Sequence, residues 1–208
     1  EGHAYPYSQN IPYYPIIDLL NKALEIDEGD SSETVREKIQ TGISGMIGEN
    51  TNLIPYIGSL FSISYPEIEE VSPEFWKKQL QKAFKSVLAS LSQGNPMIIC
   101  LEDLHWADPS FLELICTFLS EFRNPIFFLC THRPIISLFT SHQIDSMSVP
   151  YHEIRLQDLS PSESQVMVES LLMTDSIPSA LQRFVQDKIE GNPFYIEEVI
   201  NSLIESET

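Results

Sequence analysis

Two short, uninterrupted apolar runs are the clearest feature of the hydrophobic pattern. Residues 97–101 end on two adjacent acids, Glu102 and Asp103, and residues 126–130 follow a helical pattern over 108–122. A short apolar run bounded by turn residues is typical of a strand buried on both faces, as in a parallel sheet. The order strand, helix, strand predicts a parallel βαβ unit with a right-handed crossover.

Apolar residues at helical spacing predict further helices on either side of this unit. Ser32, Ser72 and Ser160 are the predicted N-caps of three of them, and Pro193 opens the last one. The predicted helices cover residues 15–24, 33–40, 73–93, 161–172, 178–190 and 193–204.

Three other stretches have different patterns. Residues 1–15 contain three prolines, which predicts the end of a strand followed by an extended loop. Residues 152–156 alternate in polarity, which predicts a third strand after those at 97–101 and 126–130. Residues 41–71 are broken by glycine and proline, so we expect short helices and a surface loop there.

These elements divide the chain into two predicted domains. Strands and helices alternate over residues 1–158, which indicates an α/β core. Only helices follow over residues 159–208, which indicates a small helical domain.

Composition narrows the class of protein. The 208 residues are 42% apolar and carry a formal net charge of -18, which argues against non-specific binding to nucleic acid or to an anionic membrane. No apolar run approaches the ~20 residues that span a bilayer. Cys100, Cys116 and Cys130 lie in apolar segments without metal-ligand spacing, as expected of reduced thiols in a cytoplasmic protein.

Candidate chemistry gathers where the two apolar runs end. Glu102 and Asp103 follow the first run, and Thr131 and Arg133 follow the second. Parallel strands present their carboxyl ends at one edge of a sheet, where ligands of open α/β folds bind. Mg²⁺ is usually shared between carboxylates and the phosphates of its substrate. The pattern therefore indicates a magnesium-dependent phosphate site.

Four stretches give the chain a family resemblance. Residues 101–108 read Leu-Glu-Asp-Leu-His-Trp-Ala-Asp, and residues 191–198 read Gly-Asn-Pro-Phe-Tyr-Ile-Glu-Glu. With residues 8–15 and 131–134, they resemble the ATPase module of the signal-transduction (STAND-type) NTPases, a branch of the AAA+ superfamily. Such modules lie beside class III adenylyl or guanylyl cyclase domains and in large bacterial regulators.

The resemblance implies a role for each of five residues. Glu102 stands at the position of the magnesium-associated acid, which is usually aspartate in the family. Asp103 stands at the position that polarises the attacking water. Arg133 and Thr131 resemble the sensor of the γ-phosphate, and Pro193 resembles the residue that packs on the adenine. The implied ligands are ATP and Mg²⁺, and the implied partners are other domains of the same polypeptide and further proteins.

One part of such a nucleotide site is missing from the sequence. The phosphate loop of these hydrolases ends in Gly-Lys-Ser/Thr, and no Gly-Lys pair occurs here. The family places that loop, with its strand, before the segment that Glu1 begins. We therefore expect a partial P-loop NTPase fold of three parallel strands, with an open edge beside residues 126–130. We also expect these residues alone to bind ATP weakly or not at all.

Several alternatives remain open from sequence. The fold could be a non-catalytic interaction scaffold, or a receiver-type or phosphotransfer domain that uses Glu102 and Asp103. Asp108 is interpreted as a helix cap, and His105 with Trp106 either pack the loop or relay nucleotide state. The lysines at positions 77, 78, 82 and 85 are interpreted as a solvated helix face rather than a phosphate site.

Overall fold

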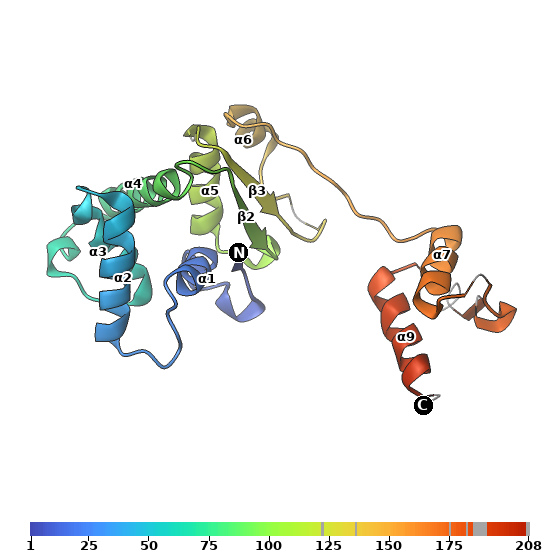
Figure 1. Ribbon diagram of the computed structural model, residues 1–208. Helices are drawn as coiled ribbons and strands as arrows, with labels where there is room; N and C mark the ends of the chain where they lie inside the picture. The colour runs from blue at the N-terminus through green and yellow to red at the C-terminus, as the bar shows by residue number, and fades with distance from the viewer. Residues whose placement is uncertain (122, 136, 175, 182, 185–190, 207–208) are drawn as a thin grey trace. The chain divides into compact units, whose positions relative to one another are not determined.

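The computed structural model describes residues 1–121, 123–135, 137–174, 176–181, 183–184 and 191–206. The chain forms two compact units, Glu1–His152 and Glu153–Thr208, which are described separately (Figure 1). They divide within residues 151–160, which have no regular secondary structure. The predicted boundary between residues 158 and 159 lies in the same segment.

The first unit is built on a parallel sheet of three strands in the order β1, β2, β3. These strands are Gly2–His3, Met97–Glu102 and Ile126–Cys130. The register pairs Gly2 with Leu101 and Met97 with Ile126, so all three strands run in one direction. The predicted strand end near the N-terminus, both apolar strands and the parallel βαβ unit are therefore confirmed.

The predicted strand over residues 152–156 is wrong. These residues are extended but pair with no strand among the described residues, and Ile154 and Leu156 are exposed. Alternating polarity indicates a strand only where a neighbouring strand supplies hydrogen bonds and a core accepts the apolar side chains. Neither is present here. The third strand of the sheet is instead β1, and β3 is a terminal strand, as expected.

The sheet is buried on one face only, which corrects the prediction that both faces are buried. Ile99 and Leu101 are buried on the covered face, whereas Ile98 and Phe127 on the other face are 69% and 62% exposed. Leu129 on the same face is also exposed. A continuous apolar run shows that both faces tolerate burial, but the helices of the first unit cover just one.

Three helices of the first unit cover the buried face. They are α1 (Tyr14–Ala23), α4 (Pro73–Leu91) and α5 (Pro109–Glu121). The first approaches so closely that a Cβ at Gly2 would lie 2.4 Å from the Pro15 carbonyl oxygen. A glycine is therefore required where β1 meets α1.

Capping residues set the starts of several helices. The side chain of Ser72 accepts a hydrogen bond from the N–H of Phe75 and begins α4, as predicted. The predicted cap of α2 (Ser32–Ile47) is off by one residue, because Ser31 accepts from the N–H of Thr34. That helix is also longer than predicted, because buried Ile43 and Ile47 continue its apolar face past two glycines.

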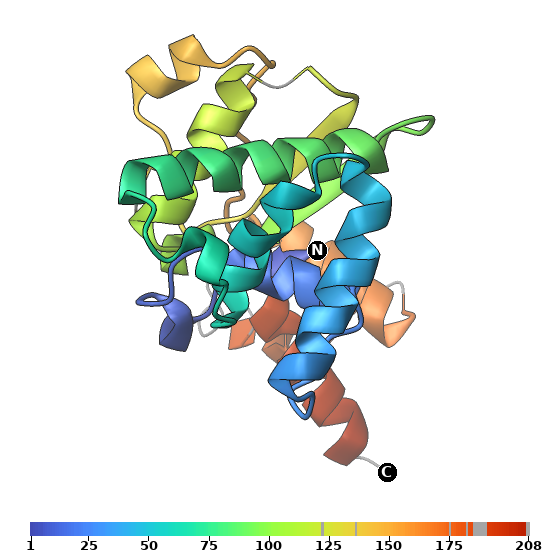
Figure 2. The ribbon, with the colours of Figure 1, turned by 90° about the vertical axis from the view of Figure 1, so that its left-hand side faces the viewer.

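Residues 41–47 belong to α2, which corrects the prediction there, whereas the rest of the region 41–71 folds as short pieces, as expected. Helix α3 (Ile54–Gly58) lies between 3₁₀ turns and packs with α2 and α4 (Figure 2). A further helix, α6 (Ser141–Ser146), was not predicted from sequence. It begins with a capping box between Thr140 and Gln143, the signal that could have identified it.

The second unit pairs two helices, α7 (Pro161–Leu172) and α9 (Pro193–Ser206). Val168, Ile196 and Ile200 are fully buried between them. The predicted capping box at the start of α7 is present. Of the helix predicted over residues 178–190, residues 179–181 and 183–184 are helical, and 182 and 185–190 lie outside the described residues.

Candidate functional site

The two candidate acids lie where β2 ends. Glu102 is the last residue of the strand, and Asp103 follows it with a left-handed backbone, φ 55°. This conformation turns the chain into a short 3₁₀ helix, Leu104–Trp106. The side chains of Glu102 and Asp103 are 40% and 61% exposed, so both are accessible to a ligand.

Thr131 fixes this turn through three hydrogen bonds. Its Oγ1 accepts from the N–H of Asp103 at 3.0 Å, and its carbonyl accepts from the N–H of Leu104 at 2.9 Å. Its own N–H donates to the carbonyl of Leu101 at 2.9 Å. Thr131 therefore lies beside the acids, as expected for the ends of parallel strands, and its hydroxyl group holds the turn in place. Its role as a phosphate sensor stays a prediction.

The side chain of Asp108 connects two segments that are far apart in the sequence. Its Oδ1 accepts from the N–H of Phe111 at 3.0 Å, and its Oδ2 accepts from the N–H of Tyr13 at 2.8 Å. Asp108 is buried, and Tyr13 has a left-handed backbone, φ 62°. The predicted helix cap is confirmed. The bond to Tyr13 additionally joins the loop before α1 to the turn after β2.

His105 is a buried imidazole beside the acids. Its side chain is 4% exposed, its Nδ1 lies 3.8 Å from Asp103 Oδ1, and its ring lies 4.8 Å from that of Trp106. Neither ring nitrogen has a hydrogen-bond partner among the described residues. Burial lowers the pKa of His105, against the Asp103 carboxylate, which acts to raise it. The positive charge of Arg133, which follows the end of β3, also lowers this pKa.

The lowered pKa of His105 predicts a pH dependence of stability. In the folded state His105 stays neutral below pH 6.5, where the unfolded chain binds a proton. Its contribution to the free energy of unfolding is therefore complete above that pH and is lost as the pH falls below it. We expect His105→Phe to flatten the decline in urea midpoint between about pH 7 and pH 5.5. The exposed His142→Gln is the matched control, and equal slopes in both variants would contradict the expectation.

The remaining candidate residues differ in their surroundings. Arg133 is exposed and forms no salt bridge with any carboxylate in the described part of the first unit. Pro193 is exposed at the start of α9, in the second unit, and its placement relative to Glu102 is not defined. Among the α4 lysines, Lys78 and Lys82 are exposed, as expected of a solvated face, whereas Lys77 and Lys85 are half-buried and pair with glutamates of α5.

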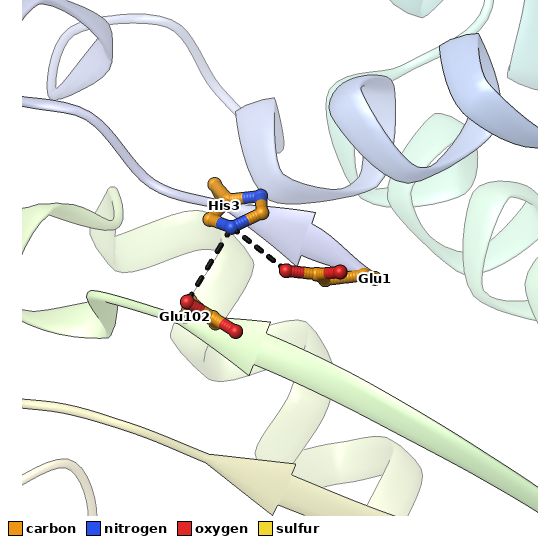
Figure 3. Close-up of side chains that lie close together, drawn as sticks. All are labelled: Glu1, His3 and Glu102. Atoms are coloured by element: carbon orange, nitrogen blue, oxygen red, sulfur yellow. Dashed lines mark ion pairs between the residues drawn. The ribbon is translucent and has the colours of Figure 1, made fainter.

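Sequence reasoning missed the neighbours of Glu102 on β1. His3 Nε2 lies 3.4 Å from Glu102 Oε2 and 3.0 Å from Glu1 Oε1 (Figure 3). The strand end expected near the N-terminus was a usable signal, because a parallel neighbour of β2 places its own side chains beside those of Glu102. The sequence does not indicate the register of the sheet, which pairs His3 with Glu102.

The described residues fit half of a magnesium–nucleotide site. Glu102 and Asp103 supply the carboxylate oxygens that Mg²⁺ prefers. The sequence does not supply the glycine-rich loop and lysine that hold the phosphates of ATP. Among the described residues, no helix is both long and apolar enough to cross a membrane.

Comparison with known proteins agrees with this geometry. The family model described as an AAA ATPase domain matches residues 1–129, more than half of the 208 residues. The model of a domain of unknown function, DUF8739, matches residues 160–208. No curated protein and no solved structure matches the chain. The first match spans β1, β2, the acidic turn, the Asp108 cap and all of β3 except Cys130, and on this basis the chain belongs to the AAA ATPase domain family.

Proposed function

We propose that this chain provides the acidic half of a regulatory ATP site in a multidomain signalling protein of the STAND type. The observation that carries the proposal is the pair Glu102 and Asp103 at the carboxyl end of β2, with Thr131 and Arg133 at the end of β3. An AAA ATPase domain uses such a sheet edge to handle a nucleotide. A cyclase is the output domain suggested by the sequence resemblance.

Each side chain has a task in this proposal. Asp103 orients the attacking water and accepts its proton, because its exposed carboxyl group lies beyond the strand. Arg133 offsets negative charge that develops on the transferred phosphoryl group. Glu102 would hold Mg²⁺, which supplies charge neutralisation at the phosphates. Pro193 would pack on the adenine, as the resemblance implies.

In this proposal the phosphate cradle comes from a polypeptide segment other than residues 1–208. The open edge of β3 and the exposed apolar side chains of Ile98 and Phe127 support this. An apolar sheet face that no helix covers marks a surface that another segment buries. A strand, phosphate loop and helix would pair with β3 and cover this face. Binding of ATP to residues 1–208 alone is then weak.

Asp103→Asn tests the proposal in a protein that carries both this chain and the phosphate loop. We expect about 100-fold slower ATP hydrolysis with nucleotide affinity retained, because the amide cannot accept the proton of the attacking water. Steady-state phosphate release and calorimetry measure the two quantities. Asp145→Asn, on exposed α6, is the matched control.

The same experiment distinguishes the proposed ATPase from the alternative, a non-catalytic interaction scaffold. That alternative is favoured by the contact between His3 Nε2 and Glu102 Oε2 at 3.4 Å, because it engages the acid that the resemblance assigns to the metal. A scaffold would show no hydrolysis before or after the substitution. Hydrolysis that is unchanged by Asp103→Asn would remove Asp103 from its proposed role.

A further inference from the structure

A compact group of metal-ligating side chains lies where β1 meets β2. Figure 3 shows the carboxyl groups of Glu1 and Glu102 both approaching one nitrogen of the His3 ring. His3 Nε2 is 3.0 Å from Glu1 Oε1 and 3.4 Å from Glu102 Oε2, and one ligand atom of each residue lies within 4.8 Å of the others. His3 is the register partner of Glu102, and Glu1 lies two residues earlier, just before β1 begins.

We propose that Glu1, His3 and Glu102 form a binding site for a divalent transition metal of the zinc class. Zinc accepts imidazole nitrogen and carboxylate oxygen at about 2.1 Å, so neighbouring ligands of a tetrahedral ion are about 3.4 Å apart. The two distances from His3 Nε2 are already close to this spacing. Three protein ligands leave a fourth position for water or a ligand.

Asp18 supplies the outer partner that a metal-binding histidine requires. Its Oδ2 accepts from the backbone N–H of His3 at 2.9 Å and lies 3.4 Å from the ring Nδ1. Burial acts to raise the pKa of Asp18, but hydrogen bonds from Lys22 and His3 hold it below its ordinary value. An ionised Asp18 can accept a hydrogen bond from Nδ1–H. The ring then carries its proton on Nδ1, and the Nε2 lone pair is directed at the two glutamates.

The ammonium group of Lys22 lies beside the same ring nitrogen, Nδ1, as Asp18. Its Nζ lies 3.0 Å from His3 Nδ1 and 2.8 Å from Asp18 Oδ2. An ammonium group this close to Nδ1 favours the tautomer with its proton on Nε2, so we expect that tautomer when no metal is bound. Metal binding at Nε2 should move the ring proton to Nδ1, which then donates a hydrogen bond to Asp18, while Lys22 keeps its bond to Asp18. The change of tautomer is therefore a signature of the site.

This site differs in chemistry from the magnesium site proposed at Glu102. Mg²⁺ favours oxygen ligands and phosphates, whereas imidazole favours zinc and its neighbours in the first transition row. The zinc-class site needs neither ATP nor the phosphate loop. It can therefore be tested on residues 1–208 as they stand, and its failure does not touch the role of Asp103.

The test is calorimetric titration of the chain with Zn²⁺. The N-terminal amine is first acetylated, because a free amine and a histidine at the third position offer Cu²⁺ or Ni²⁺ a planar site of their own. We expect one equivalent of Zn²⁺ to bind. His3→Gln and Glu102→Gln should weaken binding by about 100-fold and 10-fold, and Asp18→Asn by about 10-fold. His142→Gln, on α6, should change nothing.

Two further measurements decide the outcome. In ¹⁵N spectra of the imidazole, Zn²⁺ should move the His3 proton from Nε2 to Nδ1, and Asp18→Asn should weaken this response. Excess Mg²⁺ should leave the zinc affinity unchanged within about twofold. Equal affinity of the unaltered chain and His3→Gln would overturn the proposal, as would displacement of Zn²⁺ by Mg²⁺. Circular dichroism separates lost binding from lost folding in each variant.

Discussion

Replacing Asp108 with alanine is expected to lower the free energy of unfolding of the first unit by about 3–4 kcal/mol. The carboxyl group accepts two backbone hydrogen bonds at once, from the N–H groups of Phe111 and Tyr13. Asp108 itself is buried, so water cannot replace both acceptors. Each buried donor left without a partner costs about 1–3 kcal/mol.

The comparison with Asp108→Asn measures the cost of losing one of the two bonds. The amide oxygen can still accept one of the two N–H groups, so we expect about half of the loss. Urea denaturation followed by the fluorescence of Trp76 and Trp106, both in the first unit, measures the difference. Asp145→Asn on exposed α6 is the control for loss of charge. Equal stability of Asp108→Ala and the unaltered chain would show that neither bond is needed.

Replacing Gly191 with alanine is expected to unfold the second unit while leaving the first intact. A Cβ at this position would lie 2.2 Å from the carbonyl oxygen of Leu159, and the backbone φ is +81°. The same two residues are joined by a 2.7 Å hydrogen bond from the N–H of Leu159 to the Gly191 carbonyl. Strain and overlap together cost about 3 kcal/mol. The unit has a small buried core, formed by Val168, Ile196 and Ile200, so this loss is large for it.

The measurement is amide hydrogen exchange resolved by segment. Gly191→Ala should remove protection in α7 and α9 and preserve it in α4 and α5. Gly29→Ala is the matched control, because a Cβ there meets no atom within 4 Å. Loss of protection in both units after Gly191→Ala would mean that the two units do not fold separately.

The sequence was most informative where a local signal and the tertiary fold agree. The apolar runs of β2 and β3 and the caps at Ser72 and Ser160 predict elements that the structure contains. The side chain of Asp108 could also be assigned as a cap, because its N–H partner is only three residues away. Its second partner, Tyr13, is 95 residues away and has no local signal.

The predictions from sequence are wrong where strand pairing, or the covering of a sheet face by helices, decides the structure. Residues 152–156 have the polarity of a strand but no neighbouring strand pairs with them among the described residues. The face of Ile98 and Phe127 is apolar but exposed, and no local pattern reveals whether a helix covers it. Likewise, Glu102 could be predicted at the strand end, but its contact with His3 depends on the sheet register.

The pairing of β1 with β2 has a consequence for Glu102. The register sets His3 opposite Glu102, and the N–H of Ala4 donates to the carbonyl of Glu102. Protein segments open locally without global unfolding. Each such opening at this place separates His3 from Glu102, so the time that this acid spends free is set by the opening equilibrium of the neighbouring strand.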